Sequence, residues 1–211
     1  MPVAKALLVA LSLILAAPAV SEPYPSSAGP LAVEQVAGGL EHPWGLAFLP
    51  DGRLLVTERP GRLRLVEDGI ISAPLEGVPP VFAQGQGGLL DVVLSSDFAK
   101  TGLLFLGLAD PIGRGEARSA VVRARLADDR LADVETIFRQ QPAVRGGRHF
   151  GLRIVPAPDG TLFIGMGDRG LKDPAQDLDT TIGKLVRINP DGSVPADNPF
   201  VGRSGALPEI F

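Results

Sequence analysis

The chain has two histidines, His42 and His149, and histidine is the side chain whose ordinary titration lies nearest neutral pH. His149 lies at the predicted start of a strand, and Asp168 follows the predicted strand Leu162–Gly167. These two strands flank the turn at Asp159, so antiparallel pairing brings both side chains to the same end of one hairpin. A carboxylate beside an imidazole fixes the ring tautomer and stabilises the imidazolium, so the pair predicts a general base. A turn aspartate is the alternative interpretation of Asp168.

A glycine-rich segment, Gln84–Gly88, is the second candidate site. Its glycines permit close approach of a ligand to the backbone, and the amide of Gln86 offers a donor and an acceptor to a polar substrate. A flexible loop is the alternative interpretation. The acidic residues Asp173, Asp177 and Asp179 lack the spacing and central glycine of a calcium loop, which favours a solvated acidic loop, and no metal ligand is predicted.

The segment Gly165–Gly170 has the G-x-G-x-x-G spacing of a dinucleotide-binding loop. That motif functions only where a helix begins at its glycines and directs amide N–H groups at a pyrophosphate. Asp173 and Pro174 interrupt any such helix, and no strand–helix–strand unit surrounds the segment. The sequence therefore argues against a Rossmann-type dinucleotide site.

These candidate residues lie between short runs of β-favouring residues that alternate with turn dipeptides. Three groups of strands are predicted: Gly45–Leu49, Arg53–Glu58 and Arg62–Glu67; Leu89–Leu94, Gly102–Ala109, Ala120–Leu126 and Val134–Arg139; Gly151–Val155, Thr161–Met166 and Lys184–Ile188. Trp44–Val56 aligns with Phe150–Ile164, and the Asp-Gly turns in the two segments lie two units of about 54 residues apart. We therefore expect an all-β propeller of four-stranded antiparallel blades, with a β-sandwich as the alternative.

The composition limits the classes of function. With 26 Gly and 20 Pro among 211 residues, the chain is too rich in turn formers for a coiled coil, and its 45% hydrophobic residues can build a core. Charged residues make up 21% and the net charge is −4, which argues against disorder and against a nucleic-acid-binding surface.

The N-terminus predicts export. Lys5 precedes the apolar run Ala6–Leu15, and a small-x-small pattern ends at Ala19, as in a cleavable signal peptide; a buried N-terminal helix is the alternative. We expect a signal peptide at residues 1–19, a Pro/Ser-rich linker at 20–30 and the propeller domain at 31–211. No other segment approaches the roughly 20 apolar residues of a membrane span, and the absence of cysteine means stability without disulfides. A periplasmic or secreted protein is predicted.

An ordered series of motifs carries a resemblance to a known family. Its segments are Gly39–Gly52, Gly85–Val92, Gly147–Gly151, Gly167–Gly170, Ala175–Leu178 and Gly183–Asn189. Together they resemble the soluble, PQQ-dependent aldose sugar dehydrogenases of the glucose/sorbosone dehydrogenase family, from about Leu31 to Phe211. The resemblance implies a periplasmic six-bladed propeller that binds pyrroloquinoline quinone (PQQ) near its axis and oxidises aldoses to lactones, with the electron acceptor unknown.

The resemblance also implies roles for individual residues. His149 matches the general base that takes the proton of the anomeric hydroxyl, and Asp168 the carboxylate that orients it. Gln86 matches a polar residue at the face of the substrate and cofactor, and Gln176 a further glutamine lining the site. Arg148 stands where the better-known glucose dehydrogenases have an acid, which argues against a preference for glucose.

The chain ends where the family sequence continues. Further cofactor-binding cations and calcium ligands are expected beyond Phe211, and the length corresponds to about three and a half blades. We therefore expect a truncated form that binds PQQ poorly by itself. Two other functions stay open: a non-catalytic propeller that binds carbohydrate or protein, and a lactonase-type propeller hydrolase.

Overall fold

The computed structural model describes residues 24–211, so the predicted signal peptide lies outside the described residues. The chain divides into two compact units after Val36. In the described part of the first unit, Tyr24 and Leu31 form an antiparallel bridge with a backbone hydrogen bond in each direction. The strands and helices of the described residues all belong to the second unit, Ala37–Phe211.

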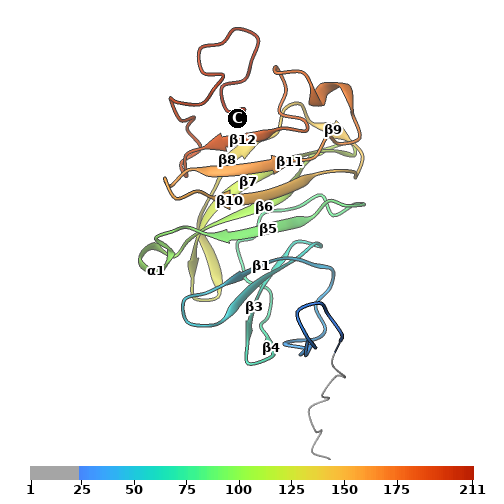
Figure 1. Cartoon of the computed structure of the whole chain (residues 1–211), viewed down its shortest axis with the longest axis vertical. Helices are drawn as coiled ribbons and strands as arrows, with labels where there is room; N and C mark the ends of the chain where they lie inside the picture. The colour runs from blue at the N-terminus through green and yellow to red at the C-terminus, as the bar shows by residue number, and fades with distance from the viewer. Residues whose placement is uncertain (1–23) are drawn as a thin grey trace, which may run out of the picture. The chain divides into compact units, whose positions relative to one another are not determined.

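Three antiparallel sheets follow one another along the second unit, each made of strands that are consecutive in sequence (Figure 1). The first contains β1 (Pro43–Phe48), β2 (Leu54–Glu58), β3 (Arg62–Glu67) and β4 (Ile70–Ile71). The second contains β5 (Leu89–Leu94), β6 (Leu103–Gly113), β7 (Glu116–Ala127) and β8 (Arg130–Arg139), with β9 (Val144–Arg145) beside β7. The third contains β10 (Gly151–Pro156), β11 (Leu162–Met166) and β12 (Leu185–Ile188). Among residues 24–211, helical structure is limited to α1 (Phe98–Thr101) and the 3₁₀ helix η1 (Asp173–Ala175), so the all-β prediction is confirmed.

One turn recurs in the first and third sheets and again after β12. In each copy an aspartate carboxylate accepts a hydrogen bond from the backbone N–H two residues later: Asp51 from Arg53, Asp159 from Thr161, and Asp191 from Ser193. The glycine that follows each aspartate has a φ between 86° and 92°, a region that glycine enters without a Cβ penalty. The Asp-Gly dipeptides at Asp51, Asp159 and Asp191 therefore adopt the same turn for the same structural reason.

The sheets are arranged as successive blades of a propeller. β5 contacts both β1 and β10, so the first strands of the three sheets lie side by side. One apolar cluster, which includes Leu55, Leu63 and Leu104, fills the space between the first and second sheets. A second, which includes Phe105 and Ile164, fills the space between the second and third. Three sheets with a separate core between each neighbouring pair are incompatible with the two-sheet sandwich alternative.

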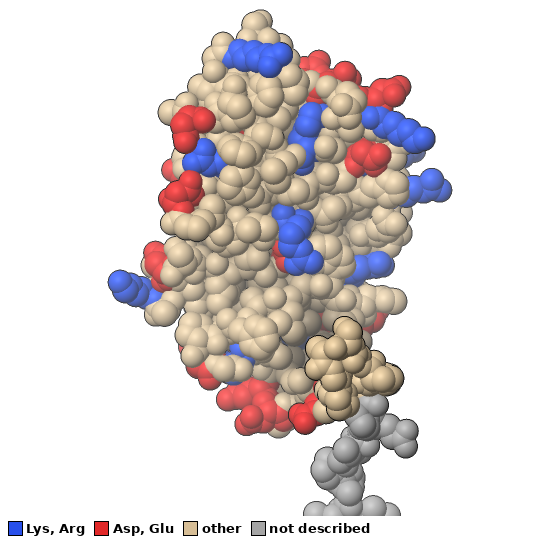
Figure 2. Space-filling view, viewed as in Figure 1, with Lys and Arg blue, Asp and Glu red and all other residues tan. Residues whose placement is uncertain are grey.

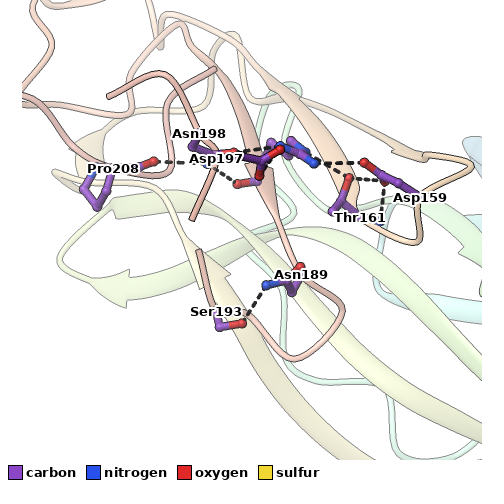
Figure 3. Close-up of polar contacts among 8 residues, drawn as sticks. Asp159, Thr161, Asn189, Ser193, Asp197, Asn198 and Pro208 are labelled. Atoms are coloured by element: carbon purple, nitrogen blue, oxygen red, sulfur yellow. Dashed lines mark hydrogen bonds and ion pairs between the residues drawn. The ribbon is translucent and has the colours of Figure 1, made fainter. Parts of the chain in front are cut away.

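The segment after β12 packs back on the third sheet. Ile210 forms an antiparallel bridge with Val186 of β12. The buried Arg187 side chain donates to Asp159 Oδ2 and Asp197 Oδ1, both at 2.9 Å, and the amide of Asn198 donates to Arg187 O at 2.9 Å. Figure 3 shows this network between the turn at Asp159 and the returning segment. It lies at the turn end of the β10–β11 hairpin and closes the third sheet there.

The charged side chains on the face drawn in Figure 2 are distributed over the surface, with Lys and Arg interspersed among Asp, Glu and uncharged residues. This distribution agrees with the small net charge of −4. No helix among the described residues has the length and hydropathy that crossing a bilayer requires.

Candidate active site

His149 and Asp168 lie together at the open end of the β10–β11 hairpin. The strand register, in which Gly151 pairs with Met166, places His149, two residues before β10, opposite Asp168, two residues after β11. His149 Nδ1 is 2.7 Å from Asp168 Oδ1. The two side chains are 52% and 32% exposed, so the pair faces solvent at one edge.

The hydrogen bonds of Asp168 determine which ring nitrogen carries the proton. Asp168 Oδ1 also accepts a hydrogen bond from the Gly170 backbone N–H at 2.8 Å. This bond, together with the contact to His149, lowers the pKa of Asp168, so the carboxylate is ionised at neutral pH. An ionised carboxylate only accepts, so in the neutral ring Nδ1 carries the proton and Nε2 has a free lone pair. No described residue forms a hydrogen bond with Nε2, so this nitrogen is available to accept a proton.

Gln86 contacts His149 from the loop that precedes β5 of the second sheet. Its side-chain Oε1 accepts a hydrogen bond from the His149 backbone N–H at 2.8 Å, and its own N–H donates to Gly147 O at 2.8 Å. The loops can approach this closely because a Cβ on Gly147 would lie 2.6 Å from Gln84 O. Gly147 is therefore needed for the contact between the two loops. The segment Gln84–Gly88 is a packed loop that supports His149.

Arg169, the residue after Asp168, lies beneath the loop that carries His149. It is 5% exposed, and its guanidinium donates to Arg148 O, Ala117 O and Gly146 O at 2.8, 2.8 and 2.6 Å. The guanidinium also lies 3.6 Å from the ring centroid of Phe150. Its contacts therefore include the backbone before His149 and the ring of Phe150 after it.

Gln176 is the predicted site residue that the structure does not join to the others. It follows η1 and is exposed, and its side chain forms no hydrogen bond with His149, Asp168 or Gln86. Its loop is nevertheless held in place, because the buried Lys184 donates to Pro174 O and Ala175 O at 2.9 and 2.8 Å. Burial lowers the pKa of Lys184.

An open pocket of about 510 Å³ adjoins the pair along the third sheet. It reaches the candidate site through Gly151 and Gly167, while His149 and Asp168 do not line it; its other lining residues are Trp44, Arg153, Gly165, Met166, Gly183, Lys184 and Leu185. Arg153 lies 4.7 Å above the Trp44 ring and donates to the buried Asp91 at 2.8 Å. Asp91 also accepts the Ile154 N–H at 2.7 Å, so the wall of the pocket links β5 to β10.

Within residues 24–211, no group of three or more His, Asp or Glu side chains is arranged to hold a metal ion. The segment Gly165–Gly170 is followed by a turn and then by η1, which has three residues, so it does not begin the helix that a dinucleotide site requires.

The comparison with known families decides the relationship. The profile of the family described as Glucose / Sorbosone dehydrogenase matches residues 40–211. The chain belongs to this family. The match covers all of the motifs from Gly85 to Asn189 and most of the first, which confirms the predicted resemblance.

Individual members of the glucose/sorbosone dehydrogenase family support the assignment. The aldose sugar dehydrogenase YliI of Escherichia coli is 48% identical over 183 residues, which cover 85% of this chain and 49% of that protein. The crystal structure of the soluble E. coli aldose sugar dehydrogenase in the apo form has a TM-score of 0.82 at 47% identity and covers 84% of this chain and 52% of that chain. The PQQ-bound aldose sugar dehydrogenase of Streptomyces coelicolor has a TM-score of 0.68 at 31% identity, over 85% and 52% of the two chains. The chain thus spans about half the length of the relatives it matches.

The residues that sequence reasoning missed are buried cations. Arg169 and Lys184 both donate to backbone carbonyls beneath candidate site loops. Arg169 lies between Asp168 and Gly170, and Lys184 between Gly183 and Leu185, and these neighbours give no sign that either side chain points inward. The adjacent pair Asp168-Arg169 after a strand was the nearest available signal, since one residue of such a pair can face solvent while the other faces the core.

Proposed function

We propose that this protein is a PQQ-dependent aldose dehydrogenase that oxidises aldose sugars to lactones, and that this chain supplies its proton acceptor. The observation that carries the proposal is the His149–Asp168 pair, whose Nε2 has no partner among the described residues and whose side chains reach solvent. Family membership and the relatives named above support the class of reaction.

The residues of this chain divide the proton chemistry among them. His149 Nε2 accepts the proton of the anomeric hydroxyl as that carbon is oxidised, and Asp168 stabilises the imidazolium that results. Gln86 holds the backbone of His149, so the ring nitrogen stays at one position. Bound PQQ would act as the hydride acceptor, which supplies the redox chemistry that no amino-acid side chain provides.

The surroundings of His149 fit a flat polycarboxylate cofactor. Arg148 is exposed, and its guanidinium forms no ion pair within the described part of the chain, so it is free to bind a cofactor carboxylate. Gly146 precedes His149 by three residues and Gly170 follows Asp168 by two, and a Cβ added to either glycine would have no atom within 4 Å. The backbone next to the pair is therefore open, and Arg148 offers a cation to a ligand that binds there. We also propose that Gln176 lines this site and that calcium supports cofactor binding.

The proposal is tested in the full-length protein supplied with PQQ and Ca²⁺, by aldose-dependent reduction of a redox dye. We expect His149→Ala to lower turnover by about 10² to 10⁴-fold, as loss of a general base does, with PQQ affinity from an absorbance titration unchanged. His42→Ala is the matched control, because His42 is also exposed and has a similar φ, 49° against 47° for His149.

Three outcomes would overturn this assignment. Binding of sugar without PQQ-dependent dye reduction would support the non-catalytic propeller instead. Equal loss of turnover and PQQ affinity in His149→Ala would assign His149 to cofactor binding. Hydrolysis of a lactone substrate without dye reduction would favour the hydrolase.

We further propose that residues 1–19 are a signal peptide, residues 20–30 a linker and residues 31–211 part of the propeller domain, and that the protein is exported to the periplasm or secreted. The support is the basic residue, apolar run and small-residue cleavage pattern at residues 5–19.

A further inference from the structure

Arg169 is a buried cation whose hydrogen bonds go to backbone carbonyls. Nε donates to Arg148 O, Nη1 to Ala117 O and Nη2 to Gly146 O, and the guanidinium stacks on Phe150. Two of these carbonyls belong to the loop that carries His149, and the third belongs to β7 of the second sheet. The side chain therefore ties the His149 loop to a neighbouring blade.

No carboxylate among the described residues pairs with Arg169, although an uncompensated buried charge is costly. Burial lowers the pKa of Arg169 to about 10, so the side chain remains charged at neutral pH. The comparison with Arg187 is informative, because that arginine is similarly buried at 8% exposure but is paired with Asp159 and Asp197. A contribution to stability explains the burial of Arg187, which is paired with two carboxylates, but not the burial of Arg169, which is paired with none in the described part of the chain.

The backbone around His149 adopts a conformation that needs such support. His149 has a φ of 47°, in the left-handed region that residues other than glycine seldom occupy. The His149 carbonyl accepts the backbone N–H of Arg169 at 3.2 Å, and the carbonyl before it accepts Arg169 Nε. Asp168 and Arg169 thus hold the same residue in two ways, the first through its ring and the second through its backbone.

We infer that Arg169 is a positioning residue for His149: it fixes the loop backbone so that the ring meets Asp168 with Nδ1 and presents Nε2 to solvent. The inference rests on the proposed function for its catalytic meaning, but the geometry it describes can be measured without cofactor or substrate.

The test uses the imidazole tautomers, because the chain has two histidines and each gives its own signals. A long-range ¹H–¹⁵N correlation spectrum of the ¹⁵N-labelled chain at neutral pH reports which ring nitrogen carries the proton. In the wild-type chain we expect His149 to be protonated at Nδ1. In Arg169→Met, which keeps an apolar side chain over Phe150 and removes all the donors, we expect His149 to become a mixture of both tautomers while His42 is unchanged.

Arg187→Met is the matched control, since it removes a similarly buried arginine of β12 that contacts the other end of the β10–β11 hairpin through Asp159. Both variants should unfold at lower urea concentration, but Arg187→Met should leave the His149 tautomer as in the wild type. A folded Arg169→Met chain with the wild-type His149 spectrum would overturn the inference, as would an equal change in both variants. Should Arg169→Met fail to fold, Arg169→Lys gives the same readout, because one ammonium cannot reproduce three diverging bonds.

Kinetics of the full-length protein separate this inference from the proposed function. We expect Arg169→Met to lower kcat roughly 10- to 100-fold with little change in KM, as a misplaced catalytic group does. An inactive wild-type protein would refute the proposed function and leave the tautomer result standing. An active Arg169→Met variant with wild-type kcat would refute the positioning role and leave the function standing.

Discussion

The substitution Asp168→Asn separates the charge of the aspartate from its geometry. Asp168 Oδ1 accepts two hydrogen bonds, from His149 Nδ1 at 2.7 Å and from the Gly170 N–H at 2.8 Å. In the asparagine variant, an amide oxygen at this position can accept both. The opposite amide orientation would place an N–H₂ group against the Gly170 N–H, leaving that donor without a partner. The Gly170 backbone should therefore hold the amide in the orientation that keeps Nδ1 protonated.

The expected loss of rate in Asp168→Asn follows from the one property that the substitution removes. Only the negative charge disappears, and a charge-assisted hydrogen bond is about twice as strong as a neutral one, which corresponds to roughly a tenfold loss of rate in a step that forms imidazolium. Asp168→Ala also removes the acceptor and frees the ring, so we expect its loss to approach the 10² to 10⁴-fold value of a missing general base.

The assay is PQQ- and aldose-dependent dye reduction by the full-length protein, with the His149 tautomer measured in the same variants. A loss near 10⁴-fold in Asp168→Asn, the value seen in a serine protease when the tautomer is reversed, would refute the reasoning about Gly170. Equal losses for the asparagine and alanine variants would refute it as well. A tenfold loss with Nδ1 still protonated is the expected result.

Two further predictions concern stability and processing. Burial by itself would raise the pKa of Glu58, but its hydrogen bonds with Arg62, the Glu41 N–H and Arg64 lower it to about 2 from 4.5. A lowered carboxylate pKa stabilises the fold above pH 4.5 and loses that effect as the pH falls toward 2, so the stability difference between wild type and Glu58→Gln should shrink by about 3 kcal/mol over that interval in urea titrations. For export, mass spectrometry of the mature protein should find an N-terminus directly after Ala19; an intact Met1 in protein recovered from outside the cytoplasm would contradict the predicted signal peptide.

The sequence predicts most of the fold because the fold depends on local chemistry. The recurring Asp-Gly turns follow from one aspartate side chain and one glycine, both visible in the sequence, and they fix the register of their hairpins. The proximity of His149 and Asp168 follows from that register, which is why counting from the Asp159 turn is sufficient to predict it.

The contacts that sequence reasoning missed connect different blades. Arg169 reaches Ala117, and Asp91 binds Arg153 and the Ile154 N–H, across separations of more than 50 positions. A local pattern contains no information about which blades become neighbours, so it cannot show that these charges are buried. Gln176 is the converse case, since its motif was recognised but its side chain is exposed and has no contact that assigns it a role.

The first sheet shows why the proposed site depends on particular residues rather than on the blade itself. There the Arg59 N–H donates to His42 O, just as the Arg169 N–H donates to His149 O, and each arginine follows an acidic residue. In the first sheet, however, that acid is Glu58, whose carboxylate is occupied by Arg62 and Arg64, and Arg59 Nε has no partner in the described chain. The same backbone arrangement thus occurs twice, but the pairing of imidazole and carboxylate occurs in the third sheet, where a shorter acid meets the ring and a fully bonded arginine holds its loop. Further sites of this kind should therefore be identified by the acidic residue and the arginine, because a histidine at this backbone position occurs in both sheets.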